Sequence, residues 1–93
     1  MKQAIASVQI DNERVSVTEW KFAPGAETGW HRHERDYVVV PQTTGKLLLR
    51  SKAGENLSEL FSGKAYFRKA GVEHNVINAS ESEFVFVEIE LKA

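Results

Sequence analysis

The sequence has 93 residues, a formal net charge of −1 at pH 7 and 42% hydrophobic residues, enough for one modest core. Charges of both signs are spread along the chain, which gives no electrostatic footprint for nucleic acid or an acidic membrane. There is no cysteine, which excludes disulfides and thiolate metal sites, and no stretch approaches the roughly 18 apolar residues of a membrane span. We therefore expect one cytoplasmic domain over residues 1–93, with no nucleic-acid or membrane partner.

Short apolar runs separated by turn residues predict strands rather than helices throughout the chain. The predicted strands cover residues 8–11, 14–22, 29–34, 37–40, 46–51, 56–61, 65–68, 74–78 and 83–91. In the second strand the alternation changes phase near Thr18 and Glu19, which predicts a bulge there. The register of strand 56–61 stays open, because Leu57 and Phe61 share one face while Leu60 lies on the other. Short strands spaced about ten residues apart are typical of an all-β sandwich or barrel.

The last predicted strand has apolar side chains on both of its faces. Its odd positions from 85 to 91 are all aliphatic, while Phe84 and Phe86 precede Glu88 and Glu90 on the other face. A sheet face in water is mainly polar, so we expect both faces to be covered. Intrachain packing and a dimer interface are both simple explanations, and the small core favours a homodimer.

The three histidines lie in two glycine-punctuated segments, residues 25–33 and 63–78. His31 and His33 are one residue apart on an extended segment, so their side chains point to the same side. On its own such a pair is more often solvated than metal-bound. With His74 as a third imidazole, the set favours an open metal centre with positions left for water, oxygen or substrate.

Both histidine segments keep a definite order of glycines and histidines. In the first segment the order is Gly25, five residues, His31, one residue and His33. In the second segment it is Gly63, five residues, Lys69-Ala70-Gly71, two residues, His74, three residues and Asn78. Together the two orders, which span more than half of the chain, resemble the two motifs of the cupin superfamily, with Lys69 in place of a proline.

The resemblance implies an all-β, single-domain antiparallel jelly-roll barrel with a divalent metal ion inside. Carried over residue by residue, it implies that His31, His33 and His74 are the metal ligands. The metal remains open among Fe, Ni, Mn, Zn and Cu, because nitrogen and oxygen sites follow one affinity order for most divalent ions.

The first motif departs from the family pattern after His33, where a glutamate usually follows after three or four residues. Here those positions hold Tyr37 and Val38, and Gly45 fits the closing glycine if Val38 is the equivalent position. The motif keeps its length but loses its carboxylate. We therefore favour three histidines completed by water.

Two neighbouring side chains remain candidates for the missing position. Asp36 reaches the metal only if the turn is tight; otherwise it points away and pairs with Arg32 or Arg35. Tyr37 has the better parity with the histidines, and its phenol either hydrogen-bonds a bound water or ligand, as a candidate catalytic group, or simply fills the barrel.

The segment before His74 is a candidate docking site for an anion. Arg68 and Lys69 are adjacent at what we expect to be the barrel mouth, where they would attract a small carboxylate unless Lys69 is simply solvated. Most aromatic residues are expected in the core, and Tyr66, Phe67 and Phe86 are the candidates for lining the cavity.

The leading functional hypothesis is a metal-dependent, oxygenase-like oxidoreductase that acts on a small anionic metabolite. The alternative is a non-catalytic cupin module that binds a small molecule or a metal, since one fold hosts many functions. As a whole chain, the sequence also resembles small stand-alone cupins linked to bacterial β-alanine degradation. The runs 22–25, 29–34 and 83–91 carry this narrower resemblance.

Overall fold

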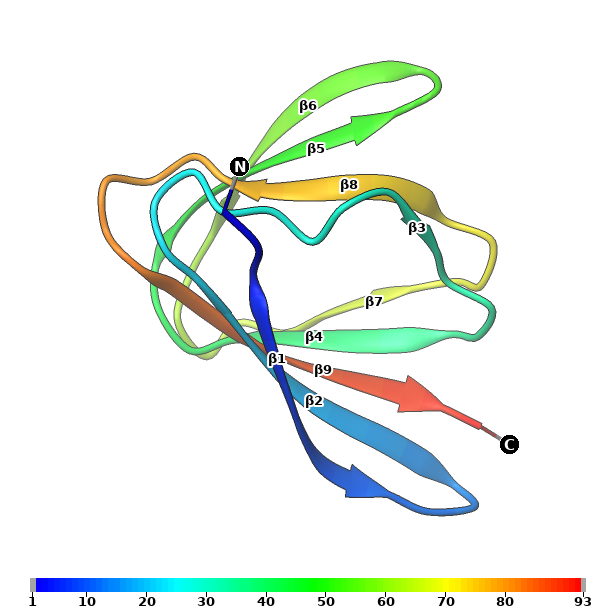
Figure 1. The fold of residues 1–93 in the computed structure, drawn as a ribbon. Helices are drawn as coiled ribbons and strands as arrows, with labels where there is room; N and C mark the ends of the chain where they lie inside the picture. The colour runs from blue at the N-terminus through cyan, green and yellow to red at the C-terminus, as the bar shows by residue number, and fades with distance from the viewer. Residues whose placement is uncertain (1, 93) are drawn as a thin grey trace.

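The computed structural model describes residues 2–92, which form nine strands and no helix (Figure 1). The strands are β1 (Ile5–Asp11), β2 (Val15–Phe22), β3 (His31–Arg32), β4 (Tyr37–Pro41), β5 (Gly45–Ser51), β6 (Gly54–Leu60), β7 (Tyr66–Arg68), β8 (Glu73–Asn78) and β9 (Phe84–Leu91). They pair antiparallel into a five-stranded sheet, β1-β2-β9-β4-β7, and a four-stranded sheet, β3-β8-β5-β6. The two sheets face each other (Figure 1), which confirms the predicted jelly-roll barrel.

The core lies between the two sheets and is built from inward positions of both. Its buried apolar members are Phe22, Ala26, Tyr37, Val39, Leu47, Leu60, Val76, Phe84 and Phe86. The alternation of side chains along each strand explains this set, because every second residue of β4 and of the first half of β9 points inward. Several core residues, among them Leu47, Val76 and Phe86, also line a cavity between the sheets.

Asn78, the last residue of the second histidine segment, is fully buried with its hydrogen bonds satisfied. Its Nδ2 donates to the carbonyls of Phe22 (3.1 Å) and Ser82 (2.9 Å), and its Oδ1 accepts from the Ser80 N–H at 2.9 Å. A buried amide without such partners would destabilise the fold by about 1–3 kcal/mol. Asn78 therefore joins the end of β8 to the neighbouring sheet.

The structure corrects the predicted bulge in one strand and settles the open register of another. The predicted bulge at Thr18 and Glu19 is wrong, because β2 pairs with β9 in unbroken register; the irregularity lies in the partner strand β1, between Val8 and Ile10. The open register of residues 56–61 is settled by burial, since Leu60 points into the core.

The outer face of the five-stranded sheet is mainly aliphatic. Register places these outward residues side by side: Val15, Val17, Val38, Val40, Val85, Val87 and Ile89. The charged pair Lys21 and Glu19, 3.7 Å apart, lies on the same face. Apolar residues on both faces of β2, rather than a bulge, therefore explain its apparent change of phase.

Residues 2–92 contain no helix that is long and apolar enough to cross a membrane.

Candidate metal centre

His31 and His74 face each other across the pairing of β3 with β8. Their positions are direct partners in the antiparallel register, so both side chains leave the four-stranded sheet on the same side. The ring centroids are 4.8 Å apart. Strand pairing alone therefore brings together two histidines that are 43 positions apart in the sequence.

His33 follows β3 and is held by the loop that leads into β8. Its N–H donates to the Val72 carbonyl at 2.8 Å, and its own carbonyl accepts from the Gly71 N–H at 2.7 Å. Gly71 has φ +100, a left-handed conformation that is costly for residues with a Cβ. The glycine of the second motif thus allows the loop to fasten the first motif.

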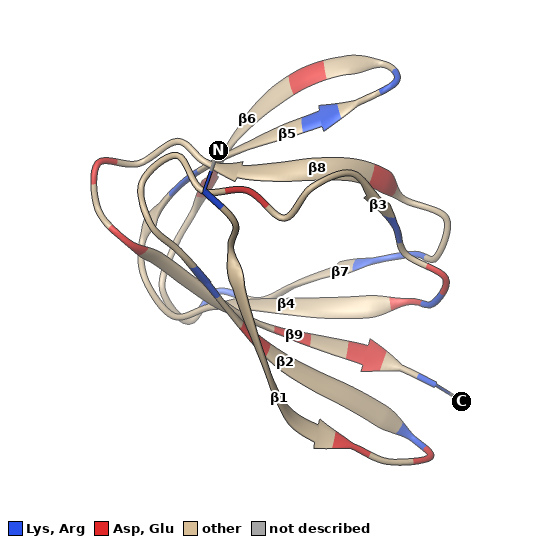
Figure 2. Ribbon diagram, in the orientation of Figure 1, with Lys and Arg blue, Asp and Glu red and all other residues tan. Residues whose placement is uncertain are grey.

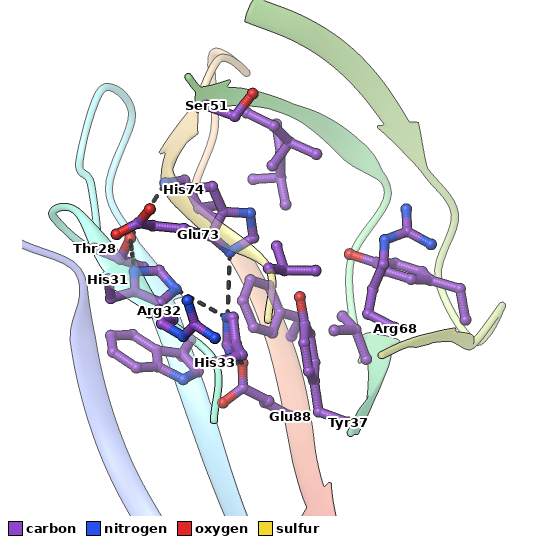
Figure 3. Close-up of a pocket in the computed structure, with 18 of the residues that line it drawn as sticks. Thr28, His31, Arg32, His33, Tyr37, Ser51, Arg68, Glu73, His74 and Glu88 are labelled. Atoms are coloured by element: carbon purple, nitrogen blue, oxygen red, sulfur yellow. Dashed lines mark hydrogen bonds and ion pairs between the residues drawn. The ribbon is translucent and has the colours of Figure 1, made fainter. Parts of the chain in front are cut away.

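The three imidazoles converge through their Nε2 atoms (Figure 3). The Nε2 of His33 lies 3.0 Å from that of His31 and 3.2 Å from that of His74. One Nε2 carries at most one proton, so it cannot donate a linear hydrogen bond to both neighbours. A cation that accepts three nitrogen lone pairs fits this donor set.

The electrostatics of the site favour neutral imidazoles. Burial first, and then the charges of His31 and His74, lowers the pKa of His33 to about 4. Burial first, and then His31 and Arg68, lowers the pKa of His74 to about 4. Both rings are therefore unprotonated at neutral pH, as ligation requires.

His31 is oriented from behind by the loop that precedes β3. Its Nδ1 lies 2.9 Å from the Gly29 carbonyl and 3.2 Å from Thr28 Oγ1. The Gly29 N–H in turn donates to Oδ1 of Asn75 at 3.0 Å. An Nδ1–H that donates to Gly29 leaves the lone pair on Nε2, which faces the other histidines.

Tyr37 and Asp36, the two candidates for the position of the missing carboxylate, lie in different surroundings. Tyr37 is 3% exposed and stacks on the His33 ring, with centroids 3.9 Å apart and planes at 20°. Asp36 is exposed and accepts a hydrogen bond from the Ala70 N–H at 2.8 Å, so it caps the loop before β8 and forms neither of the predicted ion pairs. Asp36 lies outside the histidine cluster.

A cavity of about 520 Å³ opens beside the histidines. Register on the five-stranded sheet places most of the polar lining residues in two rows, Glu90–Tyr37–Arg68 and Glu88–Val39–Tyr66. Aliphatic side chains of β5 and β8 form the opposite wall, including Leu47, Leu49 and Val76. The cavity therefore has a polar side next to the histidines and an apolar side.

Of the predicted cavity residues, Tyr66, Phe86 and Arg68 line this space. The prediction for Phe67 is wrong: it is 49% exposed, because it alternates with Tyr66 and faces outward. Lys69 is also exposed and does not line the cavity. Segments with charged side chains, on β3, β7, β8 and β9, lie at the same end of the barrel (Figure 2).

Glu88 and Glu90 were not identified as site residues from the sequence. Both line the cavity, and Glu88 Oε2 lies 4.0 Å from Nδ1 of His33. Burial first, and then the charge of Glu90, raises the pKa of Glu88 to about 7. The sequence does contain a signal for these two acids. Phe84, Phe86, Glu88 and Glu90 share one face of the same strand, so if the two phenylalanines point into the barrel, the two glutamates do so as well.

Comparison with known proteins agrees with this geometry. Residues 18–90 match the model of the cupin domain. The chain belongs to the cupin family. This cupin is 66% identical over 90 residues to the "Beta-alanine degradation protein BauB" of Pseudomonas aeruginosa, covering 97% of this chain and 95% of that protein.

Solved structures also resemble this cupin. A cupin domain from Bordetella pertussis superposes with a TM-score of 0.97 at 66% identity, covering 99% of this chain and 96% of that one. A protein with a double-stranded β-helix domain from Klebsiella pneumoniae has a TM-score of 0.81 at 23% identity, over 97% of this chain and 77% of that one. The second likeness supports the fold alone.

The departures of this cupin from its family motifs have simple structural readings. Gly45, which fits the closing glycine of the first motif, has no room for a side chain, since a Cβ there would lie 2.5 Å from Ser80 Oγ and 2.7 Å from Phe84 Cδ2. Lys69, which replaces the motif proline, is exposed. At one of the two positions where the motif has its carboxylate, the ring of Tyr37 stacks on His33.

Proposed function

We propose that this cupin binds one divalent metal ion through His31, His33 and His74 and acts on a small anionic metabolite. The convergence of three Nε2 atoms on the wall of a cavity carries the proposal. We propose further that the chain acts as one domain in the cytoplasm, in keeping with a role in metabolism.

A metal ion at this position would supply Lewis acidity or oxygen activation, as expected of an oxygenase-like oxidoreductase. The protein would hold the ion with neutral imidazoles and place a ligand between the polar and apolar walls. Tyr37 has its ring on His33, which suits it to contact that ligand. The competing function is a non-catalytic module that binds a small molecule or a metal.

The position of Arg68 favours a carboxylate as the anionic group of the ligand. Its guanidinium lies 4.6 Å from the centre of the Tyr66 ring and lines the cavity. Within residues 2–92 it forms no ion pair, whereas Arg32 on the same cavity is 3.6 Å from Glu34. An unpaired guanidinium beside a metal centre can bind a carboxylate in a bidentate manner. The name of the Pseudomonas relative supports the same substrate class, a small metabolite of amino-acid catabolism.

Metal binding is tested by elemental analysis of protein purified without chelator or affinity metal. His74→Ala should abolish bound metal while the protein remains folded, because the other two histidines leave an incomplete site. Asp36→Ala is the matched control, since Asp36 lies outside the histidine cluster, and it should retain the metal. Equal metal content in the wild type and His74→Ala would overturn the site assignment.

Catalysis is tested separately by loading the protein with ferrous iron and following oxygen consumption with a panel of small amino and keto acids. Substrate-dependent uptake that disappears in His74→Ala supports the enzyme. Saturable binding of one panel member without oxygen uptake supports the non-catalytic module.

We also propose that the aliphatic outer face of the five-stranded sheet pairs with a second copy of the chain. Valines dominate this face, and Glu19 and Lys21 already neutralise each other. Val87→Glu should convert a dimer into a monomer in sedimentation analysis. Leu57→Glu, on the outer face of the other sheet, is the control and should remain dimeric. A wild type that sediments as a monomer would contradict this proposal.

A further inference from the structure

Glu88 places a carboxylate directly behind one of the three histidines. It extends inward from β9, and its side chain is 17% exposed against 7% for His33. Figure 3 shows Glu88 on the other side of the His33 ring from His31 and His74. The first motif has no acid at positions 37 and 38, so this carboxylate comes from a strand that neither motif includes.

We propose that Glu88 is the positioning residue of His33: it holds the proton on Nδ1 so that Nε2 presents its lone pair to a metal ion. The inference rests on the metal site proposed above. Glu88 does not enter the coordination sphere in this role, because it faces the ring nitrogen opposite to the point where the three Nε2 atoms meet.

The reason lies in the chemistry of imidazole. A neutral ring carries one N–H, and the nitrogen that faces an acceptor keeps the proton. His33 Nδ1 faces Oε2 of Glu88 at 4.0 Å, which is too long for a direct hydrogen bond but close enough for the carboxylate to favour a proton on this nitrogen of the neutral ring. His31 shows the same arrangement with another acceptor, since its Nδ1 lies 2.9 Å from the Gly29 carbonyl.

Strand register explains why Glu88, rather than another acid, has this position. On β9 it pairs laterally with Thr18 and Val39, whereas Glu90 pairs with Ser16 and Tyr37. A carboxylate oxygen of Glu90 lies within 4.8 Å of ligand atoms of His33 and Glu88, but Glu90 forms no ion pair with His33. Glu88 and Glu90 lie on the same face of β9 at different distances from the His33 ring, so Glu90 is a matched control for Glu88.

The test is a titration of the chelator-treated full chain with Co²⁺, followed by competition with a chelating dye and by the absorption of bound cobalt. Glu88→Gln keeps the shape of the side chain and removes its charge, and it should weaken Co²⁺ binding roughly 10–100-fold. Glu90→Gln should have a much smaller effect. Glu88→Asp, which restores the charge, should recover part of the lost affinity.

A spectroscopic readout separates positioning from a general loss of structure. In ¹H–¹⁵N spectra of the zinc-loaded wild type, His33 should carry its proton on Nδ1. Glu88→Gln should shift that Nδ1 resonance while its thermal unfolding stays close to the wild type.

The outcomes distinguish the two proposals. Failure of the wild type to bind Co²⁺ or Zn²⁺ overturns the metal site itself. Wild-type binding that His74→Ala abolishes and Glu88→Gln leaves unchanged overturns only the role of Glu88. Binding of two ions per chain, reduced to one in Glu88→Gln, would make Glu88 a direct ligand and also overturn it.

Discussion

Tyr37 allows the packing role of a side chain to be tested separately from its chemical role. Its ring is 3% exposed and stacks 3.9 Å from the His33 ring, while its hydroxyl forms no hydrogen bond with residues 2–92 and is open to the cavity. The ring and the hydroxyl therefore have different neighbours. Tyr37→Phe removes only the hydroxyl, and Tyr37→Ala removes both.

The expected magnitudes follow from these contacts. Loss of a buried aromatic ring costs roughly 3–5 kcal/mol, and Tyr37→Ala should fall near the lower limit, about 3 kcal/mol, because one side already borders a cavity. At about 4–8 °C per kcal/mol for a domain of this size, the melting temperature should fall by roughly 12–24 °C. Tyr37→Phe keeps the stack, so its unfolding free energy should change by less than about 0.5 kcal/mol.

The assays are thermal unfolding by circular dichroism and Zn²⁺ titration of each variant. Tyr37→Phe should bind the metal like the wild type, and Tyr37→Ala should bind it more weakly because His33 loses its packing partner. Loss of metal in Tyr37→Phe would make the phenol a ligand and refute the three-histidine site. A small stability change in Tyr37→Ala would refute the packing argument.

Three further predictions concern Arg68, Gly45 and acid pH. Arg68→Ala should weaken binding of a carboxylate ligand about tenfold or more in calorimetry while Zn²⁺ binding is kept, and unchanged ligand affinity would exclude Arg68 as its anchor. Gly45→Ala should destabilise the barrel by about 1–3 kcal/mol in urea unfolding, because its Cβ has no room; an unchanged midpoint would mean that its neighbours yield. The pKa values of His33 and His74 are lowered to about 4, so the unfolded chain takes up these protons first, and metal-free protein should lose stability in urea unfolding between pH 6.5 and 4. The raised pKa of Glu88, about 7, acts in the opposite direction, so Glu88→Gln should show the steeper loss; a flat or inverted profile would contradict both assignments.

Features of the molecule that depend on local pattern were predictable from the sequence. Alternation and turn residues located the nine strands to within a few positions, because the period of two is a property of each strand alone. The spacing of His31 and His33 likewise predicts that both side chains point to one side, and the two motifs together resemble those of the cupin fold. His74 was assigned through its motif, and the structure pairs it directly with His31.

Features that depend on strand order were not predictable. β9 lies between β2 and β4, which brings Glu88 behind His33 although the two residues are 55 positions apart in the chain. Local sequence patterns do not determine which strands become neighbours in a sheet. The bulge was misplaced for a similar reason, since apolar residues on both faces of β2 imitate a change of phase. Asp36 could not be assigned because its role depends on the geometry of one turn, which aims it at the Ala70 N–H.

The pairing of His33 with Tyr37 and Glu88 has a mechanical consequence for the whole barrel. His31 and His74 belong to the four-stranded sheet, while the ring of Tyr37 and the carboxylate of Glu88 belong to the five-stranded sheet. The His33 ring lies between the two layers and contacts both. An ion held by the three imidazoles would therefore link the two sheets through the His33 ring. Binding of the ion should slow hydrogen exchange in β8, which supplies a ligand, and also in β4 and β9, which supply none.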